Sequence, residues 1–217
     1  MKSTIISRCL SMAGALLLSL TLIACECPCS KKPSSGTTPA PASLNTGAAA
    51  ASMTPDATAR AIIRINAGLD EPYKDPQGNT WAADANFEGG TSVDRPDLPI
   101  TGTNNPDIYH SERYSMDYYT FKLPNGKYLL KLHFSEDFDG ITSPDERLFT
   151  YTVKDGAPAN GKVLKEVKDF SPWKAAGGQF KAYVDSIPVT LTNNQLTITF
   201  TAQVENPQIN AIEIIPQ

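Results

Sequence analysis

The sequence predicts an all-β domain, a β-sandwich or jelly roll, and three observations support this fold class. Several short runs alternate between apolar and polar residues, which is the two-residue period of a strand with one buried face. Gly, Pro and Asn separate these runs, as they do at the turns of antiparallel sheets. No long segment beyond residue 24 keeps a helical period. Many short strands with this punctuation are typical of sandwiches and jelly rolls.

The main expected strands lie between residues 118 and 215 and contain many Thr, Ile, Val and aromatic residues. The runs are Tyr118 to Leu123, Lys127 to Phe134, Leu148 to Val153, Phe180 to Leu191, Gln195 to Ala202 and Ile209 to Ile215. Pro124-Asn125-Gly126 separates the first two runs. Because Asn and Gly tolerate positive φ, this turn predicts a hairpin that pairs these two strands with each other.

Residues 1–24 are interpreted as a lipoprotein signal peptide. Lys2 and Arg8 give a positive start, and Leu10 to Ala24 is an apolar run too short to span a bilayer as a stable helix. The run ends in Leu22-Ile23-Ala24-Cys25, which resembles the bacterial lipobox. Cys25 is therefore expected to carry lipid and to begin the mature chain. An ordinary signal peptide followed by a cysteine cluster, or an uncleaved membrane anchor, is the alternative.

Lipidation at Cys25 implies a protein of the cell envelope, anchored to a membrane on its extracytoplasmic side. Glu26 follows the cysteine where Asp would favour retention in the inner membrane. We therefore expect the outer membrane or the cell surface.

All four cysteines fall in the first thirty residues, so the globular part is expected to fold without disulfides. Cys27 and Cys29 could pair with each other, pair with another chain, bind metal or carry further acyl groups. Without a second Cys or His cluster, a structural zinc site is not expected. We therefore expect no metal and no cofactor.

Residues 25–59 comprise the lipidated N-terminus and an expected disordered linker. From Ser30 the segment consists mainly of Ser, Thr, Pro, Ala and Gly, a composition that cannot offset its ordering entropy. A flexible chain of about thirty residues reaches on the order of 30 Å, enough to hold a domain away from lipid headgroups. Residues 60–217 then form one domain, which is long enough to bury a sizeable core.

The charge balance excludes one class of partner. The formal net charge is −4, and removing Lys2 and Arg8 with the signal peptide lowers it to about −6. Affinity for nucleic acid rests on Lys and Arg contacts to phosphate. We therefore expect no binding to nucleic acid.

Five short motifs follow one another along the last three quarters of the chain. They are Ile65-Asn66-Ala67-Gly68, Trp81-Ala82-Ala83-Asp84, Ser111-Glu112-Arg113-Tyr114, Leu132-His133-Phe134-Ser135-Glu136 and Glu205-Asn206-Pro207. In this order they resemble the malectin domain, over about Ala61 to Pro216. The resemblance implies a galactose-binding-like β-sandwich that binds glucose-containing oligosaccharides through loops at one end.

A sugar site needs an exposed aromatic ring for the C–H face of the sugar and acids or amides for its hydroxyls. Matching the binding positions of malectin to this chain gives Trp81 and Phe138 as aromatic contacts and Glu205 as the carboxylate. Two other aromatic contacts of malectin are Asp94 and Asp139 here. The implied pocket is more polar than that of malectin, so a preference for glucose disaccharides is not assumed.

Structural interpretations compete with these roles. Trp81 is alternatively a core or rim residue, and Phe138 a plug under a loop. Asp137, Asp139 and Gly140 hint at a calcium loop, but the twelve-residue ligand pattern is missing and a solvated turn is favoured. The remaining motif residues are interpreted as ties between loops, turn residues or packed strand residues: Asn66, Asp75, Asp84, Glu112, Arg113, His133 and Glu136.

The sequence thus predicts a lipid-anchored protein that binds carbohydrate and is not an enzyme. It contains no Gly-x-Ser-x-Gly elbow, no His-Glu-x-x-His and no phosphate loop. It also gives no distance between carboxylates such as Asp94, Asp139 and Glu205, on which hydrolysis would depend. A protein-binding adhesion or scaffold module of the envelope, or an accessory subunit of a glycan-degrading system with hydrolase activity, is the alternative.

Overall fold

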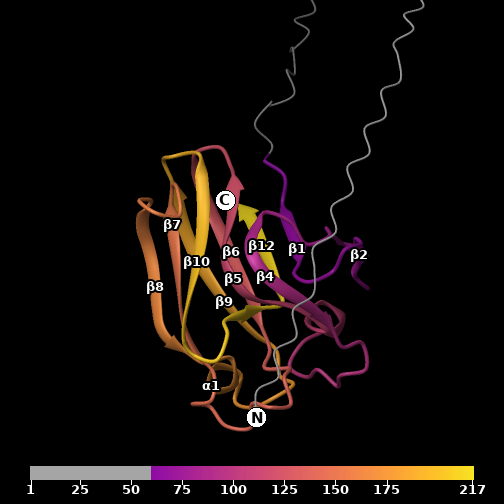
Figure 1. Ribbon diagram of the computed structural model, residues 1–217. Coiled ribbons are helices and arrows are strands. Elements are labelled where there is room, and N and C mark those ends of the chain that lie inside the picture. Colours follow the sequence, from indigo (N-terminus) through magenta and orange to yellow (C-terminus); the bar gives the residue numbers. More distant parts are fainter. Residues whose placement is uncertain (1–59) are drawn as a thin grey trace, which may run out of the picture. The chain divides into compact units, whose positions relative to one another are not determined.

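The computed structural model describes residues 60–217 of the chain. Within this range two antiparallel β-sheets form a sandwich, accompanied by a small two-stranded ribbon (Figure 1). The predicted all-β sandwich is therefore confirmed. The signal peptide, Cys25 and the linker, residues 1–59, lie outside the described residues. No helix of the described part is long and apolar enough to cross a membrane.

The first sheet has four strands, in the order β1-β12-β6-β9. These are β1 (Ile63–Asn66), β12 (Ala211–Pro216), β6 (Gly126–Phe134) and β9 (Tyr183–Leu191). β6 alternates buried residues such as Tyr128, Leu130 and Leu132 with more exposed ones, because one face of the sheet covers the core. The alternation seen in the sequence is thus the alternation of core and outer face.

The second sheet has six strands, in the order β11-β5-β10-β7-β8, with β4 on the other side of β5. Its strands are β4 (Phe87–Asp94), β5 (Ser111–Lys122), β7 (Leu148–Asp155), β8 (Lys162–Phe170), β10 (Gln195–Val204) and β11 (Gln208–Ile209). The small ribbon pairs β2 (Tyr73–Lys74) with β3 (Thr80–Trp81). A 3-10 helix η1 (Pro106–Tyr109) precedes β5, and the short helix α1 (Pro172–Ala176) follows β8.

Aromatic rings from both sheets meet in the core. Phe134 of β6 lies 4.7 Å from Phe170 of β8 and 5.7 Å from Tyr151 of β7, measured between ring centroids. Burying one such side chain contributes roughly 1.5 to 3 kcal/mol. This cluster joins the sheets without disulfides, since the chain has no cysteine after Cys29.

The hairpin predicted at Pro124-Asn125-Gly126 is wrong. β5 pairs with β4, β10 and β11, whereas β6 pairs with β9 and β12, so this turn passes from one sheet to the other. Phe121 and Tyr128 from the two strands are both buried in the one core, which requires the strands to face each other across it. The backbone N–H of Asn125 donates to Oδ1 of Asn194 at 3.2 Å, and the backbone N–H of Asn194 donates to Oδ1 of Asn125 at 2.7 Å.

Two long strands have no alternating pattern, and the sequence did not reveal them. β4 contains Gly89 and Gly90, and its residues are mostly exposed because it forms a sheet edge. β8 forms the opposite edge and carries Lys162, Lys165 and Lys168. Lysines on an edge strand discourage pairing with other chains. Edge strands whose residues are mostly exposed leave little periodic signal.

Gly68 occupies a position that other residues cannot fill. Its φ is +90°, and an added Cβ would lie 2.5 Å from the backbone oxygen of Glu112. A contact that short requires the backbone to move, and the left-handed conformation adds strain for any other residue. The Asn-Ala-Gly motif therefore marks the place where the loop after β1 touches the start of β5.

The predicted strand from Ile209 to Ile215 is split at Asn210, where the chain passes from β11 in one sheet to β12 in the other. The Asn210 side chain is fully buried and accepts a hydrogen bond from the Ser135 N–H at 2.7 Å. Its amide nitrogen donates to the carbonyls of Tyr109 and Ser111 and to Oδ2 of Asp137, at 3.1, 2.9 and 2.9 Å. One amide thus ties both sheets together.

We expect Asn210→Ala to lower the free energy of unfolding by about 3 kcal/mol or more, because it leaves several buried polar groups unpaired. Asn210→Asp has the same shape, but it turns a second acceptor toward two carbonyls and a carboxylate, so it should destabilise as much. Urea unfolding followed by circular dichroism measures both effects. Asn160→Ala, on an exposed turn, is the control and should change stability by less than about 0.5 kcal/mol. An Asn210→Asp variant of wild-type stability would contradict this role.

Candidate functional site

A buried ion pair joins two loops at one end of the sandwich. Nε and Nη2 of Arg147 donate to the two carboxylate oxygens of Glu136 at 2.7 and 3.2 Å, and both side chains are nearly inaccessible. Nη1 of Arg147 donates to the backbone oxygen of Asn206. Glu136 also accepts from the N–H of Phe138 at 3.3 Å. The loop after β6 and the loop after β10 are therefore held together, as expected for a bracing role of Glu136.

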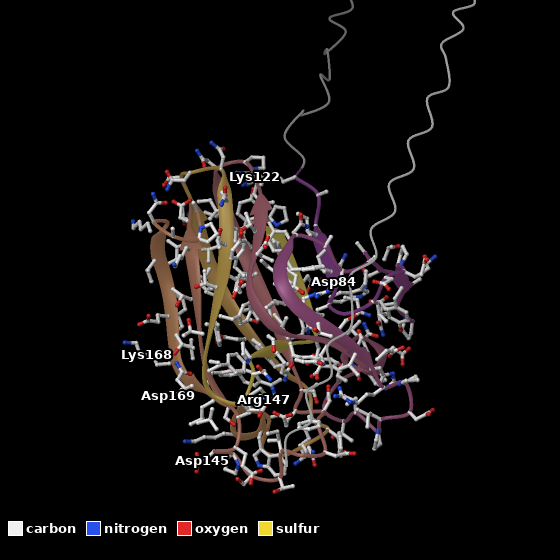
Figure 2. All side chains as sticks on the ribbon, in the orientation of Figure 1. Asp84, Lys122, Asp145, Arg147, Lys168 and Asp169 are labelled. Atoms are coloured by element: carbon white, nitrogen blue, oxygen red, sulfur yellow. The ribbon has the colours of Figure 1, made fainter. Side chains whose placement is uncertain are left out.

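A pocket of about 180 Å³ lies beside this ion pair. It is lined by Val93, Arg95, Glu112, Tyr114, Phe138, Arg147, Glu205 and Asn206. Figure 2 shows Arg147 at one end of the domain and Lys122, the last residue of β5, at the other. Ligand pockets commonly measure about 300 to 1,000 Å³, so this one suits a single sugar ring or one side chain of a larger ligand.

Two of the five predicted binding residues meet in this pocket. Phe138 lies in the loop after β6 with 44% of its surface exposed. Glu205 follows β10, is exposed, and has a φ of +57°. A left-handed conformation costs a residue with a side chain about 1 to 2 kcal/mol. Strain of this kind is common at functional sites and motivates the assignment of one here.

Trp81 does not provide the exposed ring that was predicted. It is only 4% exposed and packs in a small second core with Ile108 and Tyr109. Its indole N–H donates to Oδ2 of Asp75 at 3.0 Å, and its ring lies edge-on to His133 at 5.6 Å. Trp81 therefore lies in the core, as in the structural alternative, and a side chain this buried offers little ring surface to a sugar.

Asp94 and Asp139 are not among the residues that line the pocket. Both are exposed, and each is next in sequence to a lining residue. Successive residues of a strand point to opposite faces, so Val93 and Arg95 face the pocket while Asp94, between them, faces away. Asp139 follows Phe138 in the loop after β6. The acids that replace the aromatic contacts of malectin thus border the pocket rather than line it.

Most of the other motif residues are structural, as predicted. Oδ2 of Asp84 accepts from the Gly68 N–H at 2.8 Å and from Nε of Arg113 at 2.6 Å, and its Oδ1 accepts from Tyr119 at 2.9 Å. The Arg113 guanidinium also lies over the ring of Phe87, 3.4 Å from its centroid. These contacts connect three of the five motifs and hold β5 against its neighbours.

Glu112 was interpreted as a tie between loops, and the structure gives it a second place as a pocket residue. Its Oε1 accepts from Nη1 of Arg95 at 3.1 Å, which is the predicted tie. Its Oε2 is buried and has no hydrogen-bond partner among the described residues. An unpaired buried carboxylate oxygen is costly unless something supplies a donor.

Asp137 adds a second buried acid behind the pocket. Its Oδ2 accepts from Asn210, whereas its Oδ1 has no partner among residues 60–217. Burial raises the pKa of Asp137 to about 7, and the nearby charges of Glu112 and Glu136 act in the same direction. Near neutral pH this carboxyl is therefore divided between its protonated and ionised forms.

The remaining polar groups do not assemble a metal site. No group of three or more His, Cys, Asp or Glu side chains in the described part is placed to hold a metal ion. Of the two acids of the suggested calcium loop, Asp137 is buried and Asp139 is exposed. His133 is packed, as predicted: burial lowers its pKa to about 4, and Nδ1 bonds the Tyr109 hydroxyl at 2.9 Å.

Sequence patterns could have identified some of the lining residues that were not predicted, but not all of them. Tyr114 follows Glu112 by two positions on β5, so strand alternation alone places both on one face. Asn206 belongs to the Glu-Asn-Pro motif. Arg147 and Arg95 carry no such signal, because each is a single arginine whose acidic partner is distant in sequence.

The domain combines a β-sandwich, a pocket at one end and five motifs whose residues are mostly buried or partly buried. The malectin domain family model matches residues 61–212. The chain therefore belongs to the malectin domain family. Membership supports a module that binds carbohydrate or protein.

Sequence relatives show the same domain inside much longer proteins. A probable LRR receptor-like serine/threonine-protein kinase of Arabidopsis thaliana is 35% identical over 100 residues, 43% of this chain and 9% of that protein. The kinesin-like protein KIN-14E of Oryza sativa subsp. japonica is 27% identical over 154 residues, 70% of this chain and 14% of that protein. The chain thus spans a small part of the curated relatives it matches.

Solved structures show the same fold. The β-glucuronidase of Bacteroides uniformis matches with a TM-score of 0.60 and 20% identity, over 72% of this chain and 18% of that one. The ANXUR1 extracellular domain of Arabidopsis thaliana matches with a TM-score of 0.59 and 17% identity, over 71% of this chain and 47% of that one. A chain in the crystal structure of the plant peptide RALF23 in complex with FER and LLG2 matches with a TM-score of 0.59 and 19% identity. The match covers 71% of this chain and 48% of that one. At these identities the likeness is one of fold.

The raised pKa of Asp137 predicts a dependence of stability on pH. Between about pH 4 and pH 7 the folded protein keeps a proton that the unfolded chain releases, so this residue lowers the free energy of unfolding as pH rises. Asp137→Asn removes the titration and keeps an acceptor for Asn210. Relative to wild type, the variant should therefore be more stable at about pH 8 than at about pH 5. Urea unfolding of both proteins at both pH values measures this, and a difference that does not change with pH would contradict it.

Proposed function

We propose that this protein is a membrane-anchored lipoprotein that captures oligosaccharide or polysaccharide in the pocket at the end of its malectin domain. One observation supports the proposal most strongly. Phe138 and Glu205, which match sugar-binding positions of malectin in sequence and are distant from each other in the chain, line the same pocket. Their convergence is a consequence of the fold and does not follow from either match alone.

The side chains of the pocket complement the two surfaces of a sugar ring. The exposed faces of Phe138 and Tyr114 offer apolar area for the C–H groups of a pyranose. The Glu205 carboxylate accepts from hydroxyls and is itself oriented by the amide of Asn206, which donates to its Oε1 at 2.8 Å. These groups come from β5 and from the loops that follow β6 and β10, so the rigid sandwich fixes their spacing.

The pocket opens at the end of the domain farthest from Arg60, where the described chain begins. Arg60 lies against Tyr128 and donates to the carbonyl of Gln217 at 3.3 Å. Gln217 lies beside the start of β6, near the end of β5 (Figure 1). Glu112 at the other end of β5 lines the pocket, and twelve strand residues extend roughly 35 Å. The pocket therefore lies at the end of the domain opposite the point where a linker to a lipid anchor would attach.

A protein ligand is the second candidate. One similar fold was determined with the peptide RALF23 in a complex with FER and LLG2, although that likeness concerns the fold alone. In this chain apolar surface is exposed by Phe138, in the loop after β6, and by Val204, the last residue of β10 and the neighbour of Glu205 in sequence. Exposed apolar side chains of this kind also suit a peptide.

We assign no hydrolysis to the pocket. The sequence has no recognised catalytic motif, and glycoside cleavage would require two carboxyl groups placed on opposite sides of one scissile bond. Incubation of the protein with each bound oligosaccharide, followed by an assay for new reducing ends, tests this assignment. Release of sugar that stops in Glu205→Gln would contradict it.

A glycan array probed with the purified protein should identify bound sugars. Phe138→Ala and Glu205→Gln should each weaken the best hit by about tenfold or more, because they remove a stacking surface and a charge-assisted bond worth about 1.5 to 3 kcal/mol. Calorimetry measures both changes. Both side chains are exposed, so melting temperatures should stay near that of wild type.

Two exposed residues away from the pocket are matched controls: Val184→Ala on β9 and Glu166→Gln on β8. They should leave binding unchanged. Unaltered affinity in Phe138→Ala and Glu205→Gln would reject the pocket as the site. Capture of peptides but of no glycan would favour the second candidate.

The anchor gives a separate prediction. Cells fed a fatty-acid probe should label the protein, and Cys25→Ala should abolish both the label and removal of the signal peptide. Cys29→Ala is the control and should keep the label, because only Cys25 follows the Leu-Ile-Ala run. A labelled Cys25→Ala protein would contradict the proposed anchor.

A further inference from the structure

The pocket combines aromatic walls with acidic groups. Tyr114 and Phe138 supply the rings, and Glu112 and Glu205 supply the carboxylates. Glu205 is exposed at the rim, whereas Glu112 is 2% exposed and ends in an oxygen without a partner among residues 60–217. Aromatic faces and carboxylates both attract cations.

The two arginines that line the pocket do not balance this charge, because each of them is already bonded to a carboxylate. All three guanidinium nitrogens of Arg147 are bonded, to Glu136 and to the backbone of Asn206. Nη1 of Arg95 is bonded to Glu112, and a quarter of the Arg95 side chain remains exposed. Arg95 is thus the cation that an acidic ligand would have to use.

The pocket lining and the buried acids behind it together contain four acids and two arginines: Glu112, Glu136, Asp137 and Glu205 against Arg95 and Arg147. The excess is negative even when Asp137 holds a proton. The buried Oε2 of Glu112 adds to it, since it finds no donor among the described residues. In a partly buried pocket such a charge acts more strongly than it would in water.

We propose that the pocket takes a protonated amine, and that its ligands are glycans with a free amino group in preference to neutral or acidic ones. This inference rests on the proposed carbohydrate-binding function and narrows it to a class of sugar. An ammonium group meets the rings of Tyr114 and Phe138 by cation–π contact and the acids by charge-assisted bonds. A carboxylate or sulfate meets the excess negative charge instead.

The test uses methyl glycosides of glucosamine, N-acetylglucosamine, glucose and glucuronic acid, which share a pyranose ring and differ in one substituent. Each is titrated into the purified protein at about pH 6, where an ordinary amine is protonated, and binding is followed by NMR. We expect the affinity for the glucosaminide to exceed that for the glucoside by about tenfold or more, and the glucuronide to bind most weakly.

Glu112→Gln keeps an acceptor for Arg95 but removes the buried charge, so it should lower the affinity for the glucosaminide much more than the affinity for the glucoside and abolish most of the preference for the amine. Glu166→Gln removes a charge from the exposed edge strand β8 and should keep the preference. Because Oε1 of Glu112 also bonds Arg95, the melting temperature of Glu112→Gln is measured to confirm that the variant is folded. A folded Glu112→Gln protein that keeps the full preference for the amine would overturn the inference.

Two other results overturn the inference alone: equal binding of the glucosaminide and the glucoside, or tightest binding of the glucuronide through Arg95. Binding of no glycoside and of no array glycan would instead overturn the proposed function, and the inference falls with it. If a lysine peptide binds the pocket and no sugar binds it, the proposed function and the inference are both overturned. That result would identify the pocket's ligand as protein.

Discussion

The architecture of this domain depends on one buried amide, the side chain of Asn210. It stands where the chain leaves the six-stranded sheet and enters the four-stranded one, and it bonds groups that belong to both. Four polar groups in the core obtain partners from a single side chain. Buried backbone groups cannot be left unpaired without a large cost, so the crossing between sheets and the position of the loop after β6 are fixed together.

The pocket inherits its geometry from this arrangement. Asn210 holds Asp137 from one side, and the Glu136–Arg147 pair clamps the same loop to the segment before β11. The motif residues that characterise the family are mostly buried in such contacts. Residues that line the pocket, such as Phe138 and Glu205, lie on the loops that the network supports. A stable scaffold therefore carries a site whose loop residues can change without loss of the fold.

Several costs to stability accumulate at this one end of the domain. Glu205 adopts a left-handed backbone conformation, Glu112 buries an oxygen that no described residue pairs, and burial raises the pKa of Asp137. Strained and unpaired groups persist when the surrounding structure holds them, and they concentrate at functional sites. The aromatic cluster between the sheets stabilises the domain enough to carry them.

The sequence by itself determined the β-sandwich, the family and the roles of most motif residues, because alternation, turn residues and local motifs are properties of neighbours along the chain. It predicted Phe138 and Glu205 for the same reason, since each lies at a fixed offset from a motif. Only the tertiary structure decided that Trp81 is covered, that Asn125-Gly126 joins opposite sheets and that Glu112 reaches the pocket. Burial and ion pairing depend on partners such as Arg95 and Asn210 that are distant in sequence. The charge of the pocket is consequently a property of the folded chain.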